Sequence, residues 1–481
     1  MIDCLAAGIT RSKMPTANAR ASLLFSTILL QIAACSGATD FAPRGAAGSV
    51  ASVAGSAGSV ATGGAPSSAG GGTSRAGAGA GGSAPSAGGS AGGSAGAPAA
   101  AAGQGGSTSV AGSASFAGSP SAAAGSAAGG GPAVAPGAPE MTPRGYGQGT
   151  TGGGKAKSLT VSSFAALQAA IDDYAGTGGL VLEYSGKFDF ASIKDPCVQH
   201  TLPAQTVEIK NKSEITIVGA PGSSANFGFH IAAAASNVII RNMTIGLLPG
   251  GSDSDIISVE GMSGGVPKNI WLDHNELFSS LVDCPGAGDT AFDGMIDVKK
   301  GADLITVSYN YLHDHHKLSL NGYTDGDDAV RHITFHHNLF ENVGSRVPLQ
   351  RHGYAHVVNN LFSKVLASGI NVRMGGYALV EANYFENVKN PVTARDSSAV
   401  GFWDLRNNNL RSAADVTPGN AFGITWDDGN SGTVNATAWT TTAAFPVALG
   451  YTFAAQPAQC VHDGLRAVAG ANRGLATLGC Q

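Results

Sequence analysis

Short apolar runs separated by polar turns fill the chain after about residue 180. Segments rich in Val and Ile, such as LVLEY (180–184), EITIVG (214–219), NVIIRNMTIG (237–246) and HITFHHNLF (332–340), have the length and composition of β-strands. One stretch before them, residues 161–176, has apolar residues at helical spacing, with a serine pair near its start and a glycine at its end. The pattern predicts an all-β domain that begins with a short helix.

An asparagine recurs at the end of most of these strands, in the series Asn242, Asn275, Asn310, Asn338, Asn360, Asn383 and Asn408. The last four follow one another at intervals of 22, 23 and 25 residues, which fits one coil of a parallel β-solenoid. The alternative, a β-sandwich, has turn-bounded strands about every 8–12 residues. We therefore expect a parallel β-helix with stacked asparagines, loops inserted in three early coils, and the initial helix capping the open end.

The first part of the chain has a different composition. Gly accounts for 70 of the 481 residues, and residues 36–154 consist mainly of Gly, Ala, Ser and Pro, with few side chains that could form a core. We predict a disordered linker over 36–154 and one folded domain over 155–481. The net charge is −5 and basic residues form no run, so we expect no nucleic-acid partner.

The segment RASLLFSTILLQIAAC (20–35) has the features of an export signal. A positive residue precedes an apolar run that is too short to span a bilayer, and small residues precede a cysteine, as in a bacterial lipobox. We predict a lipoprotein-type signal peptide over residues 1–35 with lipidation at Cys35; the alternative is an ordinary secretory signal. The domain would then be secreted or at the cell surface, joined to the bacterial outer membrane only by the lipid and a long flexible tether.

Four cysteines remain beyond the signal and linker: Cys197, Cys284, Cys460 and Cys480. An even number of cysteines in an exported chain favours disulfides, and the spacing does not resemble a zinc site. Three pairings are possible, of which we favour Cys197–Cys284 and Cys460–Cys480.

Four aspartates lie in two of the long coils. Asp253 and Asp255 belong to GGSDSDIISV (250–259), and Asp293 and Asp297 belong to FDGMIDVKKG (292–301). Residues two or four apart on a strand share a face, so each coil can direct two carboxylates the same way. Converging carboxylates repel one another unless a hard cation lies between them, and calcium takes such oxygen ligands. Solvated loop aspartates are the alternative interpretation, and two pairs on neighbouring coils favour a calcium site.

A second group of charged residues is basic. Counted from the asparagine of its coil, Lys317 is at position +7 and Arg346 is at +8, so we expect them on adjacent coils next to the aspartates. Arg351 follows in SRVPLQRHG (345–353), where Pro348 predicts a bend that brings the two arginines to one side. A groove lined by cations beside a calcium site would bind a polyanion with regularly spaced carboxylates.

The motifs NIWLDHNELF (269–278), FDGMIDVKKG (292–301), VSYNYLHDHHK (307–317), FHHNLFENVGSRVPLQRHG (335–353) and SGINVRMGG (368–376) resemble the extracellular pectate lyases of the polysaccharide lyase 1 type. The resemblance runs from about residue 155 to about residue 412, with several motifs in the same order. It implies a right-handed parallel β-helix that cleaves polygalacturonate by calcium-dependent β-elimination into unsaturated oligogalacturonates, and we expect a monomer.

The resemblance also assigns roles to individual residues. Asp255, Asp293 and Asp297 match calcium ligands, and Asp253 matches a further ligand when substrate is bound. Arg346 matches the arginine that abstracts the proton from C5 of the sugar. Lys317 and Arg351 match groups that bind the uronate carboxylate.

Three other functions remain to be weighed. A polygalacturonase would need a set of catalytic carboxylates that act without calcium. A pectin lyase would lack the calcium aspartates and have a more aromatic groove, and a surface adhesin would lack the Lys317, Arg346 and Arg351 set. The lyase interpretation accounts for the most residues.

Overall fold

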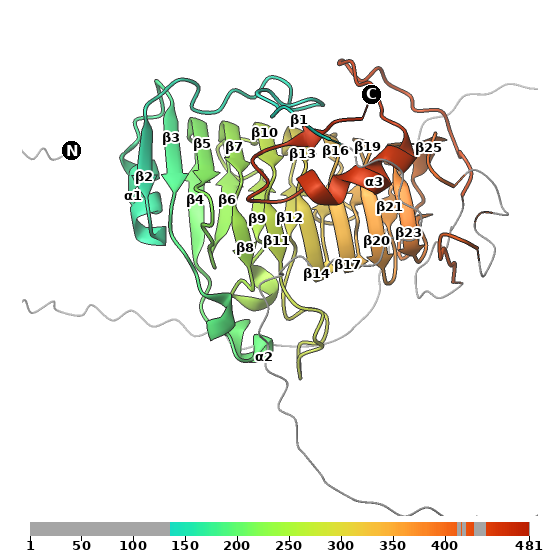
Figure 1. Cartoon of the computed structure of the whole chain (residues 1–481), viewed down its shortest axis with the longest axis horizontal. Helices are drawn as coiled ribbons and strands as arrows, with labels where there is room; N and C mark the ends of the chain where they lie inside the picture. The colour runs from blue at the N-terminus through green and yellow to red at the C-terminus, as the bar shows by residue number, and fades with distance from the viewer. Residues whose placement is uncertain (1–134, 411–414, 416–419, 428–438, 481) are drawn as a thin grey trace, which may run out of the picture. The chain divides into compact units, whose positions relative to one another are not determined.

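The computed structural model describes residues 135–410, 415, 420–427 and 439–480. Three parallel sheets make up most of this part (Figure 1). The ten-stranded sheet has the spatial order β2 (Ser158–Val161), β3 (Leu180–Tyr184), β5 (Ser213–Gly219), β7 (Ser236–Arg241), β10 (Lys268–Asp273), β13 (Asp303–Ser308), β16 (His332–His336), β19 (Tyr354–Val358), β22 (Tyr377–Glu381) and β25 (Phe402–Arg406).

The other two large sheets are built from the same coils. The six-stranded sheet contains β8 (Thr244–Gly246), β11 (Glu276–Phe278), β14 (Tyr311–Lys317), β17 (Leu339–Ser345), β20 (Leu361–Val365) and β23 (Tyr384–Val388). The eight-stranded sheet contains β4 (Thr206–Lys210), β6 (Gly228–Ala232), β9 (Ile257–Glu260), β12 (Ile296–Lys299), β15 (Leu320–Asn321), β18 (Leu349–Arg351), β21 (Ile370–Arg373) and β24 (Val392–Thr393). Each coil adds one strand to each sheet, so the described fold is the predicted parallel β-helix.

Asparagines and aromatic rings stack through the interior of the coils. In the ladder from Asn275 to Asn408, each asparagine donates from its backbone N–H and its side-chain amide to Oδ1 of the next asparagine, at 2.9–3.1 Å. Asn242 does not continue this ladder, contrary to the prediction, because the pairing of Glu276 with Thr244 places Met243 at the ladder position, where its backbone N–H donates to Asn275 Oδ1 at 3.1 Å. Phe340, Phe362 and Phe385 stack beside the ladder, with ring centroids 5.0 and 4.6 Å apart.

The predicted capping helix is α1 (Phe164–Asp173), which begins after Ser163 and buries Leu167 and Ile171. The serine hydroxyl caps the helix by accepting from the backbone N–H of Ala166 at 3.2 Å. Short helical segments occur later as η1 (Phe190–Ser192), α2 (Pro196–Gln199) and η2 (Gly251–Asp253). None of the helices in the described ranges has the length and the apolar composition needed to cross a membrane.

The folded domain includes residues before the predicted boundary at residue 154. Strand β1 (Pro136–Gly137) pairs with β26 (Thr477–Leu478), and the segment after β1 runs along the ten-stranded sheet (Figure 1). Backbone N–H groups of Tyr146, Gly147 and Gly153 donate to threonine hydroxyls of that sheet at 2.9–3.0 Å. Residues 135–154 therefore belong to the folded domain, and the rest of the predicted linker, the signal peptide and Cys35 lie outside the described residues.

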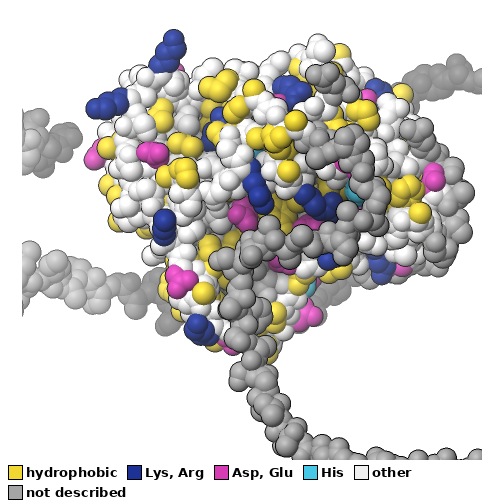
Figure 2. Space-filling view, in the orientation of Figure 1, with side chains coloured by type: hydrophobic (Ala, Val, Ile, Leu, Met, Phe, Trp, Pro, Cys, Tyr) yellow, Lys and Arg dark blue, Asp and Glu magenta, His cyan; other side chains and the backbone are white. Residues whose placement is uncertain are grey.

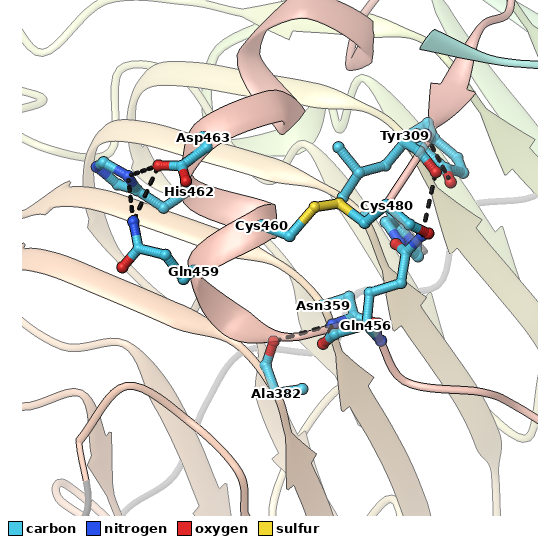
Figure 3. The surroundings of a disulfide bond; sticks show 11 residues. Tyr309, Asn359, Ala382, Gln456, Gln459, Cys460, His462, Asp463 and Cys480 are labelled. Carbon is cyan, nitrogen blue, oxygen red and sulfur yellow. Dashed lines mark hydrogen bonds and ion pairs between the residues drawn. A yellow bond between two sulfur atoms is a disulfide. The ribbon is translucent and has the colours of Figure 1, made fainter. Parts of the chain in front are cut away.

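The C-terminal segment covers another part of the stack. Helix α3 (Ala458–Val468) packs on the six-stranded sheet through Val461 and Leu465, which bury against Leu361 and Tyr384. A disulfide joins Cys460 in this helix to Cys480, and Gln456 donates to the carbonyls of Leu478 and Cys480 at 3.1 Å (Figure 3). On the face shown in Figure 2, acidic and basic side chains are interspersed.

Candidate active site

The candidate site lies on the outer face of the eight-stranded sheet. Inward positions in β12 are taken by Ile296 and Val298, which belong to the core, so Asp297 and Lys299 point outward. The register places Lys299 beside Glu260 of β9, and Arg351 of β18 beside Arg373 of β21. Charged side chains therefore line up across neighbouring coils.

Two of the predicted carboxylates meet at Gly294. A Cβ atom at this position would lie within 3 Å of the carboxylate oxygens of both Asp255 and Asp297, so only glycine leaves room for the pair. The Asp255 carboxylate accepts from the Gly294 N–H at 3.1 Å, and the Asp297 carboxylate accepts from the Leu320 N–H at 3.0 Å. Both carboxylates are almost fully buried.

The carboxylates influence one another electrostatically. Burial and the neighbouring Asp255 charge raise the pKa of Asp297 well above its usual range. Burial and Asp255 also raise the pKa of Asp293, whose carboxylate lies 3.5 Å from the Lys317 ammonium. Lys299 supplies a counter-charge, with its Nζ 2.5 Å from Asp255 and 3.9 Å from Asp297. Asp255 thus disfavours the charge of both Asp293 and Asp297, in addition to the effect of burial.

The donor set suits calcium in its chemistry. Asp255, Asp293 and Asp297 offer oxygen ligands, and a bound cation would offset the burial and the Asp255 charge that raise the pKa values of Asp293 and Asp297. Within the described ranges no three His, Cys, Asp or Glu side chains lie close enough together to hold a metal. Lys299 lies against Asp255, so a cation would displace it. Asp253 ends η2, and its side chain lies outside the described part.

Arg346 immediately follows Ser345, the last residue of β17 that pairs with β14 of the preceding coil. Lys317 pairs with Ser345, and the Arg346 carbonyl accepts from the Ser319 N–H at 2.9 Å, so Lys317 and Arg346 lie on adjacent coils. Arg346 has a φ of 59° and precedes a cis peptide bond to Pro348. Among the residues that the structure describes, its half-buried guanidinium has no hydrogen-bond or ion-pair partner.

Arg351, which was predicted to bind a substrate carboxylate, also has partners within the protein. Its Nε donates to Asp325 at 2.8 Å, and its Nη1 donates to the Gly322 carbonyl at 2.9 Å. Asp325 lies in the turn after β15, and the Ser398 hydroxyl also donates to it at 3.0 Å. Arg351 is therefore held in place by the protein itself, and a substrate carboxylate would share this guanidinium with Asp325.

Arg373 was not singled out by the sequence reasoning, although it lies in the motif SGINVRMGG. Its Nε donates to Asn371 at 3.1 Å, and burial together with the Arg351 charge lowers its pKa to about 10. The sequence contained a pattern that could have identified Arg373, because it follows Asn360 by the same 13 positions that separate Arg351 from Asn338. The outer face of the eight-stranded sheet, the candidate groove, therefore has carboxylates at one end and the neighbouring Arg351 and Arg373 at the other.

Two loops, one of them held by a disulfide, lead into the acidic end of the candidate groove. Cys197 in α2 is bonded to Cys284, so both favoured disulfide pairings are present. The loop of Cys284 leads into Asp293 and β12, and the loop of η2 leads into Asp255 and β9. A cavity of about 610 Å³ lies between these loops, lined in part by His200, Ser252 and Thr290.

The fold and site define a parallel β-helix enzyme with an acidic cluster and a row of arginines on one outer face. Residues 137–474 match the family model described as pectate lyase. The chain is 43% identical to pectate lyase B of Dickeya chrysanthemi over 63% of this chain and 80% of that protein. It therefore belongs to the pectate lyase family.

Solved structures agree with this assignment. Pectate lyase II of Xanthomonas campestris is 55% identical, with a TM-score of 0.65 over 69% of this chain and 99% of that chain. Pectate lyase C of Erwinia chrysanthemi, solved with Ca²⁺, is 39% identical, with a TM-score of 0.65 over 70% and 99%. A mutant of pectate lyase C, solved in complex with pentagalacturonic acid, is 40% identical, with a TM-score of 0.64 over 69% and 97%.

Proposed function

We propose that this lyase cleaves polygalacturonate by calcium-dependent β-elimination and releases unsaturated oligogalacturonates. The observation that carries the proposal is the half-buried Arg346 guanidinium, which has no partner in the described part of the chain and lies on the coil next to Lys317. Leaving a cation without a partner costs free energy, and an anionic substrate would supply that partner. The complex of pectate lyase C with pentagalacturonic acid supports a polymer of this chemical class.

In the proposed reaction Arg346 removes the proton from C5 of a galacturonate unit. The electron pair of the C5–H bond forms the C4–C5 double bond, and the glycosidic oxygen at C4 leaves. Lys317 and Arg351 bind uronate carboxylates and hold C5 next to Arg346. The left-handed backbone of Arg346 costs about 1 kcal/mol, an amount typical of strained positions at functional sites.

An arginine acts as a base only when its guanidinium has lost a proton, which is rare at neutral pH. Burial and the positive charge of Arg351 lower the pKa of the neighbouring Arg373 to about 10. Arg346 adds to the same cluster of positive charges. We therefore expect turnover to increase towards alkaline pH.

Asp253, Asp255, Asp293 and Asp297 would hold the calcium ion. When bound, calcium supplies positive charge that stabilises the substrate carboxylate as negative charge develops beside C5. The raised pKa values of Asp293 and Asp297 support this assignment, because a bound cation would remove the repulsion that burial intensifies.

We also propose that the domain works as a monomer on the outside of the cell. Cys35 would carry the lipid that joins it to the outer membrane, and the Gly- and Ser-rich chain before residue 135 would act as the tether. Replacing Cys35 with Ser should release the enzyme from the membrane fraction into the medium, as measured by cell fractionation.

Incubation with polygalacturonate tests the reaction. Unsaturated product absorbs in the ultraviolet, so its formation is followed directly, with and without a calcium chelator. We expect product that the chelator suppresses by more than about 100-fold and that added Ca²⁺ restores. New reducing ends without ultraviolet absorbance would contradict the proposal and indicate hydrolysis. Product that the chelator leaves unchanged would remove the calcium requirement.

A further inference from the structure

Tyr323 is an exposed aromatic residue at the rim of the candidate groove. It lies two residues after the end of β15, and 53% of its surface is accessible. Asn321 pairs with Val298, and the same register two residues further along places Tyr323 beside Lys300, the residue after β12. Gly322, immediately before Tyr323, accepts from the Arg351 guanidinium at 2.9 Å. Tyr323 therefore stands next to the cationic end of the groove.

The backbone of Tyr323 is held by a buried ion pair. One oxygen of Asp327 accepts from the backbone N–H groups of both Lys300 and Tyr323, each at 2.8 Å. The other oxygen lies 2.7 Å from the guanidinium of Arg331, which is fully buried. Arg331 also donates to the backbone carbonyl of Arg351 at 2.8 Å. The same pair thus fixes Tyr323 relative to Arg351.

The ring of Tyr323 is also supported by a charged side chain. The Lys300 ammonium lies 5.1 Å from the ring centroid, in a cation–π contact, and the Glu260 carboxylate holds that ammonium at 2.5 Å. Glu260 occupies the strand position beside Lys299 in β9. The chain Glu260–Lys300–Tyr323 therefore restricts the ring while leaving more than half of the residue accessible to a ligand.

We propose that Tyr323 is a sugar-binding platform, on which a galacturonate unit of the bound polymer packs while Arg351 contacts an adjacent carboxylate. The inference rests on the proposed function. The face of an aromatic ring carries partial negative charge, and the C–H groups of a pyranose ring carry partial positive charge. A tyrosine that is already ordered loses little conformational entropy on binding.

Kinetics of three variants test the platform. Tyr323→Ala should raise KM for polygalacturonate about tenfold and leave kcat unchanged, because binding away from the reacting atoms contributes equally to ground and transition states. Tyr323→Phe should keep the KM of the unchanged enzyme, because the ring rather than the hydroxyl makes the contact. Val330→Ala, at a 56% exposed aliphatic residue of the same turn, is the matched control and should change neither constant.

Oligogalacturonates of increasing length sharpen the test. The KM difference between the unchanged enzyme and Tyr323→Ala should be absent for the shortest oligomers and should appear once the chain is long enough to reach the rim. An unchanged KM for Tyr323→Ala at every length would overturn the platform, as would a Tyr323→Phe variant that is equally impaired.

The proposed function can fail separately from the platform. If the protein forms no unsaturated product from polygalacturonate, the proposed elimination reaction is contradicted. The platform is then tested by calorimetry, which compares the binding of pentagalacturonate to the unchanged protein and to Tyr323→Ala. About tenfold weaker binding to Tyr323→Ala supports the platform, and equal affinity overturns it.

Discussion

The same coils present polar residues on two outer faces, and the two faces treat charge differently. On the ten-stranded sheet, His336, His337 and His356 lie beneath the C-terminal segment that contains Tyr451, Phe453 and Gln456. On the eight-stranded sheet, the aspartates, Lys317 and the arginines line the candidate groove. We call the first the covered face and the second the open groove.

The three histidines of the covered face contact neutral side chains, and His356 also lies 3.4 Å from the Glu381 carboxylate. His337 shares a hydrogen bond of 2.7 Å with Gln456, His356 shares one of 2.8 Å with the Tyr451 hydroxyl, and Tyr309 stacks on His337. Burial lowers the pKa of His337 to about 3 and lowers the pKa values of His336 and His356, so these histidines are neutral near pH 7.

Charges of the same sign are neighbours in the open groove. Asp255 raises the pKa values of Asp293 and Asp297, and Arg351 lowers that of Arg373, each in addition to the effect of burial. Such repulsion is retained where an external ligand can relieve it. The difference teaches that polar groups on a covered face find their partners within the protein, as the buried Asp273 carboxylate does with Arg241. An open face, in contrast, permits charges that a substrate or a cation completes.

The largest expected effect comes from changing a charge in the open groove. Replacing Arg346 with Lys keeps the positive charge but removes the proposed base, so turnover should fall by about 100- to 10,000-fold. The free energy of unfolding should change by less than about 0.5 kcal/mol, since no described contact is lost. Initial rates on polygalacturonate and urea denaturation measure the two quantities.

Arg466→Lys is the matched control for that substitution. Arg466 lies on α3 and pairs with Glu386 and Glu341, away from the groove, so the variant should keep full turnover. Equal activity of Arg346→Lys and Arg466→Lys would exclude Arg346 as the base.

Acid should act first on the covered face. The unfolded state binds protons at its histidines below about pH 6.5, whereas the folded state does not until the pH approaches the lowered pKa values. The contribution of these histidines to the free energy of unfolding is therefore fully present above pH 6.5 and decreases as the pH falls. The decrease is about 1.4 kcal/mol per pH unit for each histidine, as long as the pH lies above its folded-state pKa. Urea denaturation between pH 7 and 4.5 measures this slope.

A single substitution assigns part of the slope to a residue. His337→Gln should lower the slope by about 1.4 kcal/mol per pH unit, because the proton-binding difference of this residue is removed. A free energy of unfolding that stays constant between pH 6.5 and 4.5 would contradict the role of these histidines.

The repeat made the fold predictable from sequence. A buried asparagine that bonds to its equivalent in the next coil must recur once per coil, so its spacing reports the architecture directly. The same spacing gave the relative positions of Lys317 and Arg346 to within one residue. It could also have located Arg373, because equal offsets from the asparagines place residues side by side.

Other features depend on contacts that spacing does not encode. The glycine-rich segment before residue 155 was predicted to be linker on composition, yet several of its glycines allow close approach to the sheet. A Cβ on Gly145 would lie 2.6 Å from a Thr334 side-chain atom, and a Cβ on Gly153 would lie 2.3 Å from the Leu180 carbonyl. Asp325 lies in a polar turn whose sequence gives no sign that it pairs with Arg351. The histidine stack likewise forms only when the C-terminal segment returns to cover it.

The two disulfides offer the most direct comparison of the faces. Replacing Cys460 and Cys480 with Ser opens a link across 20 residues beside the covered face and should lower the free energy of unfolding by about 3 kcal/mol. Turnover of the folded fraction should be unchanged, because α3 packs on the six-stranded sheet and not on the groove.

Replacing Cys197 and Cys284 with Ser is the counterpart at the open groove. This bond spans 87 residues, so its loss should lower the free energy of unfolding by about 4–5 kcal/mol. The loop released here leads into Asp293, so the concentration of Ca²⁺ that gives half-maximal activity should rise as well. Urea denaturation and calcium titration of the two double variants separate the effects. If opening Cys460–Cys480 shifted the calcium requirement as much as opening Cys197–Cys284, the two faces would not be independent.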